Sequence, residues 1–328
     1  MVSETRIDNV MFPGILFEKE VVQNFMETLV NVILPVFVVA GVAALVQPWL
    51  KLDVGTLSRV AARVFLPALT FDALWRSAPS IEDCSRMAAA AVLVTLVLLA
   101  FSEVLARVLR LNHRTRGAFA ATIMLANAGI YGLPVITSAF GDAAVMPASV
   151  YIVVFNAVLL NLAGIYLAIL GQKSLKGVLH RVVGNPVIYA AILGLAAREG
   201  VFTVPSPLLK AITWLGAGAL PVFLIVLGLQ MRESVTGSWE VRHLPALAGV
   251  VSARLVLAPL LALGFAELLG LQGLFRAAFV VDNAMPSAVL ATVLTAEFES
   301  DSAFAALGVV ATTIASLLSV TLWVNWLS

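Results

Sequence analysis

Cysteine, histidine and charge are scarce in this chain of 328 residues. Cys84 is the single cysteine, which excludes an intrachain disulfide, and the three histidines lie in polar loop sequence at no spacing that suits a metal. Only 12% of the residues are charged, and 20 basic against 19 acidic side chains give a net charge of +1. The chain therefore lacks the basic surface that nucleic-acid binding requires, and zinc or thiol redox chemistry is disfavoured.

Apolar residues, by contrast, make up 61% of the chain, more than a soluble domain of ordinary composition contains. A helix needs about 20 mostly apolar residues to cross a bilayer. We count ten such runs, of which the sixth is the shortest: Phe25–Val46, Val54–Trp75, Met87–Leu109, Gly117–Phe140, Val145–Leu170, Asn185–Ala197, Leu208–Met231, Pro245–Leu268, Gly273–Leu294 and Ser302–Trp326. The sequence therefore predicts an all-α membrane protein with ten transmembrane helices.

The polar segments divide the chain. Residues 1–24 form a charged tail without the long apolar run of a cleavable signal peptide, and residues 171–184 form a short cytoplasmic linker between two halves, 25–170 and 185–328. Ten Lys and Arg residues lie beside the odd-numbered loops and seven beside the others. This bias predicts a multi-pass protein of the inner or plasma membrane with both termini outside the cytoplasm.

Prolines recur at similar distances in the two halves. Because each half holds five spans, an odd number, the second half would enter the membrane in the opposite orientation. Inverted repeats of this kind are typical of secondary transporters, with the binding site near the bilayer midplane. The alternative is coincidence, since transmembrane helices tolerate proline. The offset is 151 residues between Pro35 and Pro186, 154 between Pro67 and Pro221, and 152 between Pro134 and Pro286.

The fourth and ninth runs contain residues that interrupt helices. One holds Asn127 to Pro134 with two glycines, and the other holds Asp282 to Ser287 with Pro286. Proline removes a backbone donor and glycine lets the backbone unwind, which is tolerable in lipid only beside protein or a polar cavity. We predict two broken helices that cross near the midplane, with half-helices that begin at Val135 and Ser287 and offer free N–H groups to an anion. A simple proline kink is the alternative.

With these motifs the sequence resembles the auxin efflux carrier family, which includes plant PIN-type auxin exporters and bacterial organic-acid carriers. The resemblance covers all ten spans. Its specific parts are the run from Asn127 to Pro134, Asn185-Pro186 with Tyr189, Arg254 followed by Pro259, Arg276, and the stretch from Met285 to Glu297.

The resemblance implies two inverted five-helix repeats, in which helices 1, 2, 6 and 7 form a scaffold and helices 3–5 and 8–10 form a transport domain. In plant members an asparagine seven positions before the helix-4 proline helps to bind the substrate carboxylate, and Asn127 stands in that position. Two departures matter. The linker is short, and Asp282 and Asn283 stand in helix 9 where neutral side chains are expected, which favours ion coupling over the uncoupled mechanism associated with plant relatives.

Ionisable residues within spans are expensive in lipid and are functional candidates by default. Arg254 lies ten residues into helix 8, where it either neutralises a carboxylate such as Asp282 or bonds the carbonyls of a broken helix. A permanent salt bridge to Arg254 or Arg276 is the alternative to a coupling role for Asp282. Glu103 lies near a helix end, where an interfacial position is expected.

We predict a secondary active transporter of a small organic anion, a symporter of elevator type. The alternatives are an uncoupled, potential-driven carrier and a membrane sensor with a transporter fold; an enzyme is disfavoured because no nucleophile lies beside a base. Asp282 and Arg254 are candidates for Na⁺ or H⁺ coupling, no other cofactor is expected, and the expected partners are the lipid bilayer and a second copy of the chain in a homodimer. The candidate substrate-binding residues are Asn127, Gly129, Tyr131, Gly132, Pro134, Asn156, Asn283, Pro286 and Ser287.

Overall fold

The structure, a computed structural model, describes residues 23–77, 79–171, 184–234 and 244–327. The regular elements in these ranges are helices joined by short loops. The predicted tail, apart from its residues 23 and 24, and residues 172–183 of the predicted linker lie outside the described residues. The one pairing of β type among the described residues is an isolated antiparallel bridge between Ala126 and Ser287.

The helices follow one another as two series separated by the linker. Turns η1, η2, η3, η5 and η7 are π turns, and η4 is a short 3₁₀ turn. The first series is η1 (Leu29–Ile33), α2 (Leu34–Leu50), α3 (Val54–Val60), η2 (Ala61–Phe65), α4 (Leu66–Arg76), α5 (Ile81–Val108), α6 (His113–Met124), η3 (Ala128–Gly132), α7 (Leu133–Phe140), η4 (Asp142–Ala144), α8 (Val145–Val154), η5 (Phe155–Leu159) and α9 (Leu160–Leu170). The second is α11 (Pro186–Arg198), α12 (Ser206–Ser234), α13 (Leu244–Ser252), η7 (Ala253–Leu257), α14 (Ala258–Leu268), α15 (Gly273–Ala284), α16 (Leu290–Glu297) and α17 (Ser302–Leu327).

Seven continuous helices in the described ranges are long and apolar enough to cross a membrane. They correspond to predicted runs one, two, three, five, seven, eight and ten, and the short sixth run is the helix Pro186–Arg198. Runs four and nine are each interrupted, as α6 followed by Ala128–Phe140 and as α15 followed by α16. The prediction of an all-α membrane protein is therefore confirmed, while the inverted relation of the two halves stays a prediction.

Four of the π turns stand directly before prolines. Turns η1, η2, η3 and η7 each end two residues before a proline, at Pro35, Pro67, Pro134 and Pro259. Proline lacks an N–H and clashes with the carbonyl four residues earlier in a regular α-helix. A π turn is wider and bonds to the fifth residue back, which gives the chain room for the proline ring at these positions.

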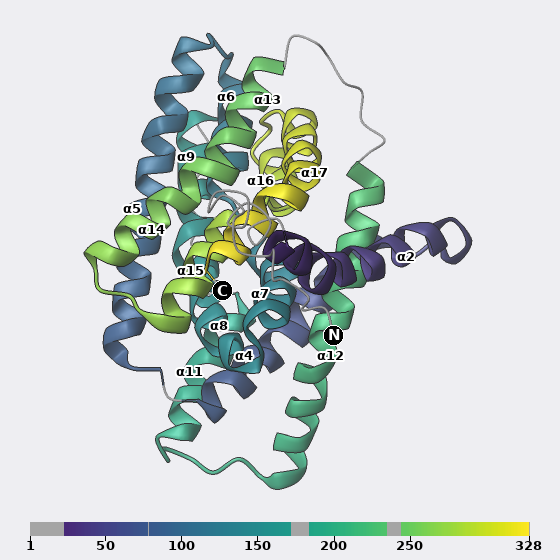
Figure 1. Cartoon of the computed structure of the whole chain (residues 1–328), viewed down its shortest axis with the longest axis vertical. Helices are drawn as coiled ribbons and strands as arrows, with labels where there is room; N and C mark the ends of the chain where they lie inside the picture. Colours follow the sequence, from purple (N-terminus) through teal and green to yellow (C-terminus); the bar gives the residue numbers. More distant parts are fainter. Residues whose placement is uncertain (1–22, 78, 172–183, 235–243, 328) are drawn as a thin grey trace, which may run out of the picture.

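The helices gather into two groups. In one, α12 packs along α2 and α4, and α11 packs along α4. In the other, α5 packs against α6 and α14, α15 packs against α14 and α8, and α17 packs against α6, α13 and α16. Figure 1 shows α2 projecting at the right and α5 with α14 along the left edge. The first group contains α2, α4, α11 and α12, and a scaffold role for these helices stays a prediction.

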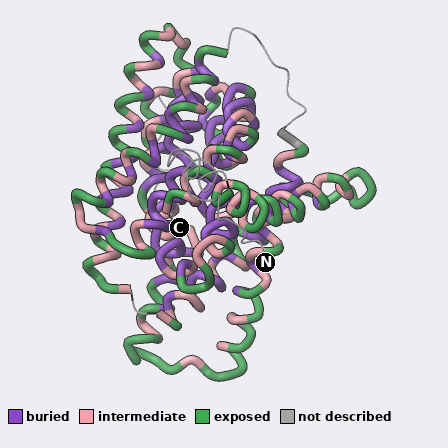
Figure 2. Tube along the Cα trace, viewed as in Figure 1, coloured by how far each residue is buried: buried purple, intermediate pink, exposed green. Residues whose placement is uncertain are grey.

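The outer faces carry exposed apolar side chains, whereas the buried residues gather where the helices meet (Figure 2). On α2 an exposed stripe at helical spacing ends at Trp49, which is 78% exposed. Such a stripe is suited to lipid. Its other members are Leu34, Val38, Val42 and Leu45.

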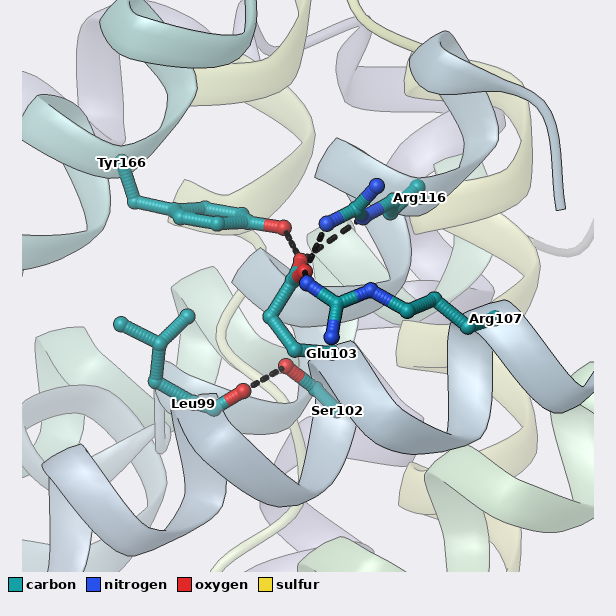
Figure 3. Close-up of polar contacts among 6 residues, drawn as sticks. All are labelled: Leu99, Ser102, Glu103, Arg107, Arg116 and Tyr166. Carbon is teal, nitrogen blue, oxygen red and sulfur yellow. Dashed lines mark hydrogen bonds and ion pairs between the residues drawn. The ribbon is translucent and has the colours of Figure 1, made fainter.

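Glu103 of α5 forms a polar cluster with three neighbours (Figure 3). Its carboxylate accepts hydrogen bonds from Arg116 Nε at 2.8 Å, from Arg107 at 3.0 Å and from the Tyr166 hydroxyl. The side chain is only 15% exposed. Glu103 thus ties α5 to α6 and α9, and two cations compensate its charge. Its interfacial position stays a prediction.

Candidate functional site

The two helix interruptions meet and pair with each other. Helix α6 ends at Met124 and α15 ends at Ala284, and the chain is extended at Leu125 and Met285. The Asn127 N–H donates to the Pro286 carbonyl and the Ala288 N–H donates to the Leu125 carbonyl, both at 2.8 Å. Backbone groups left open by each interruption are thus satisfied by the other, as burial in an apolar surrounding requires.

The second half-helices begin at other residues than predicted. After the first interruption the helix resumes at Ala128 and not at Val135, because η3 absorbs Pro134 into the start of α7. After the second, the helix resumes at Leu290 and not at Ser287. The Ser287 N–H donates to Thr312 Oγ1 at 3.1 Å, so it is not free for an anion. We therefore withdraw Val135 and Ser287 as donors at half-helix starts.

Arg254 connects the ends of the first half-helices. It comes from η7, is 1% exposed, and donates to the Ile123 carbonyl at 2.9 Å and to the Asn283 carbonyl. Carbonyls in the last turn of a helix lack helical partners, and a cation there also opposes the helix dipole. Of the two predicted roles for Arg254, the structure shows the bracing of broken-helix carbonyls.

Asp282 is fully buried, and neither carboxylate oxygen has a hydrogen-bond partner in the described part of the chain. The predicted alternatives of a salt bridge to Arg254 or Arg276 are not formed, since Arg276 pairs with Glu267 at 3.1 Å. The carboxylate packs against Gly132, where a Cβ would lie 2.6 Å from Asp282 Oδ1. Gly132 is therefore required for close approach of the two interrupted helices.

Asn283 and Ser287 also turn inward. Asn283 donates to the Phe279 carbonyl at 2.9 Å and accepts from the Tyr151 hydroxyl at 3.4 Å. The Ser287 hydroxyl donates to the Thr122 carbonyl at 2.7 Å. Both side chains are buried with internal partners, so they hold the crossing together.

A cavity lies beside the first interruption. Asn127 lines it, together with residues of α12 and α17. The Asn127 side chain makes no cap bond and has no hydrogen-bond partner within the described ranges, so its amide can reach a ligand. The helix that starts at Ala128 adds a positive dipole end next to this wall. The remaining lining residues are Leu227, Gln230, Met231, Val289, Val309, Val310, Thr313 and Ile314.

The other predicted site residues do not line this cavity. Tyr131 is buried, accepts from Ser316 at 3.3 Å and contacts the Phe37 ring edge to face. Asn156 accepts from Asn185 at 3.0 Å and links two helices. Gly129, Gly132, Pro134 and Pro286 shape the backbone of the crossing.

Sequence reasoning missed Gln230 and the apolar wall. Gln230 lies two residues before Arg232 at the end of an apolar run, a position that reads as interfacial. The apolar residues on α12 and α17 are indistinguishable by sequence from those that face lipid. Thr313 was visible as a polar residue within a span, but nothing in its neighbourhood assigned it to a ligand.

No group of three or more His, Cys, Asp or Glu side chains able to hold a metal occurs among the residues that the structure describes. The polar residues at the crossing are amides, hydroxyls and two separated charges, Arg254 and Asp282. Such a set can bind, orient or hold a proton, and it places no nucleophile beside a base.

Known proteins resemble this chain along most of its length. A profile of a family described as membrane transport protein matches residues 28–177 and 170–324. An uncharacterized transporter of Methanothermobacter thermautotrophicus is 30% identical over 283 residues, which cover 83% of this chain and 88% of that protein. A second uncharacterized transporter, from Methanocaldococcus jannaschii, is 26% identical over 226 residues, 67% of this chain and 71% of that protein.

Proposed function

We propose that this chain, which belongs to the membrane transport protein family that includes the auxin efflux carriers, moves a small organic anion across a membrane. Family membership makes it a multi-pass transporter, which is not an enzyme class. Its relatives bear no substrate name, so the substrate class has to be inferred from the site.

The cavity beside Asn127 supports this function best. Ligand sites are mostly apolar with a few convergent polar groups, and the lining of this cavity has that composition. The amide donor of Asn127 and the start of the helix at Ala128 can both stabilise a bound carboxylate. The lining residues that the structure describes include no cation, so the anion is not held too tightly to be released. The apolar wall suits the body of the anion.

The cavity lies between the two groups of helices. Leu227 and Met231 belong to α12 in the first group, whereas Val309 and Val310 belong to α17 in the second. We propose that the second group moves against the first in an elevator type of alternating access. An inner or plasma membrane location, termini outside the cytoplasm and a homodimer belong to the same proposal.

We further propose that Asp282 takes up a proton during transport. Burying a carboxylate without a partner is costly, so a neutral, protonated form fits the observed surroundings. Arg254 donates to two main-chain carbonyls and forms no salt bridge with Asp282 among the described residues. A metal cation would need several oxygen ligands, whereas a proton needs none besides the carboxylate. Sodium coupling and an uncoupled, potential-driven carrier are the alternatives that flux measurements separate.

A thermal-shift panel tests the binding site. Mono- and dicarboxylates and indole acids are added with and without sodium at two pH values, because a bound ligand raises Tm by mass action. We expect a carboxylate to raise Tm, and Asn127→Ala to weaken its binding by about 1–3 kcal/mol, or about 5- to 150-fold.

The matched control is Asn156→Ala, which removes an amide that lies outside the cavity and bonds Asn185. This variant should lose stability and keep its ligand Kd. Equal loss of affinity in both variants, or a response to no carboxylate at all, would contradict the proposed site.

A further inference from the structure

Gln230 has an unusual position in the wall of the cavity. It lies on α12, is 7% exposed, and its Nε2 donates to Ser58 Oγ at 3.2 Å. Its Oε1 is buried without a hydrogen-bond partner in the described part of the chain. Buried amide oxygens in folded proteins are nearly always satisfied, so an open one beside a cavity indicates that a ligand supplies the donor.

The cavity thus offers two amides that differ in what they can do. Asn127 belongs to the crossing and has its whole side-chain amide free, including two N–H donors that suit a carboxylate. Gln230 belongs to a different element, has one N–H engaged by Ser58, and has its Oε1 open as an acceptor. Apolar side chains make up most of the remaining lining.

We propose that Gln230 accepts a hydrogen bond from a hydroxyl or N–H group of the substrate. The transported anion then has a carboxylate for Asn127 and a hydrogen-bond donor elsewhere on a mainly apolar body, as in a hydroxy acid or a heteroaromatic acid with a ring N–H. This inference rests on the proposed function, because it assigns a second contact within the same site.

Selectivity follows from the cost of an unpaired polar group. A site built to accept a hydrogen bond rejects the analogue that lacks the donor, because the acceptor stays buried and unsatisfied. Plain fatty acids of similar size should therefore bind less well than their donor-bearing counterparts. Gln230 would act on the choice of substrate and Asn127 on the recognition of every carboxylate.

Matched pairs of acids test the proposal on the purified full chain. Suitable pairs are 4-hydroxyphenylacetate with phenylacetate, and indole-3-acetate with its N-methyl derivative, and the Kd of each is measured by calorimetry or ligand-induced thermal shift. We expect the donor-bearing acid to bind about tenfold more tightly to the wild type. Gln230→Leu should remove this preference mainly by weakening the donor-bearing member.

A further variant sharpens the result. Ser58→Ala leaves Oε1 of Gln230 in place and should keep the preference for the donor-bearing acid. Equal weakening of both members of a pair by Gln230→Leu would overturn the proposal.

The failure of this proposal is distinguishable from failure of the proposed function. If carboxylates bind the wild type through Asn127 and the two acids of each pair bind equally well, only the proposed role of Gln230 is wrong. A wild-type chain that binds no carboxylate overturns both.

Discussion

The two interruptions that pair at the crossing have opposite characters. The first holds Asn127, whose free side chain lines a cavity, among alanine and glycine. The second holds Ser287 and directly follows Asp282 and Asn283 at the end of α15; all three are buried, and Asn283 and Ser287 have internal hydrogen-bond partners. The main-chain pairing is reciprocal, so the contrast that bears on function lies in the side chains. We infer that the first interruption faces the substrate, whereas the residues at the second provide the buried carboxylate of Asp282 and the hydrogen bonds that stabilise the crossing.

The largest effect is expected from Arg254→Met. Removing this side chain leaves the Ile123 and Asn283 carbonyls without their charged donor, which should cost about 3 kcal/mol or more of the free energy of unfolding. The measurement is Tm in detergent. Arg276→Met is the control, since its partly exposed pair with Glu267 is worth less than about 1 kcal/mol. Equal Tm losses in the two variants would remove Arg254 as the brace of the crossing.

Gly129 and Gly132 both lie in η3 but differ in how closely they are packed, so alanine at each position tests packing in the same helical turn. Gly132→Ala places a Cβ 2.6 Å from Asp282 Oδ1 and 3.0 Å from Met285 Cγ, and this overpacking should cost about 1–3 kcal/mol. At Gly129 the nearest atom would be Leu66 Cδ2 at 3.9 Å, an ordinary contact, so Gly129→Ala should keep Tm.

The same pair allows a rescue. Asp282→Ala combined with Gly132→Ala removes the clashing oxygen, so the double variant should recover part of the lost Tm. Strictly additive losses would show that the carboxylate does not touch Gly132.

Asp282→Asn tests whether the second interruption carries the coupling charge. The change is nearly isosteric and removes the titratable group, so the variant should bind substrate with an affinity close to that of the wild type and lose the pH dependence of uptake. Initial rates in proteoliposomes at several pH values, with and without sodium, provide the measurement. If wild-type flux depends on sodium and not on pH, the coupling ion is sodium and not a proton. If the variant keeps the ion dependence of the wild type, Asp282 has no role in coupling.

Much of the fold was predictable because lipid imposes simple rules on a chain. Hydropathy located all seven long apolar helices of the described ranges, and glycine, proline and amides within two further runs located both interruptions. The exact resumption of the helices was not predictable: a π turn before Pro134 lets the helix start earlier than the proline suggests.

The candidate site was predictable only in part. Asn127 was predicted from its place in the interrupted run and from the family resemblance, and the burial of Arg254 followed from its depth within an apolar run. Polarity in the sequence does not show whether a side chain faces a ligand or another helix. Asn156, Asn283 and Tyr131 were therefore predicted as substrate-binding residues, whereas in the structure they have internal partners. Gln230 was not predicted as a site residue, because it lies two residues before Arg232 at the end of an apolar run, where polar side chains are expected at the membrane interface.

Solute counterflow in proteoliposomes tests the central claim most directly, with the tightest carboxylate of the binding panel as the trans substrate. The wild type should accumulate labelled carboxylate transiently against its gradient, and Asn127→Ala should slow initial uptake about 5- to 150-fold at substrate concentrations below Kd. Binding without counterflow in the wild type would show a sensor, and undiminished uptake by Asn127→Ala would place the substrate path away from the crossing.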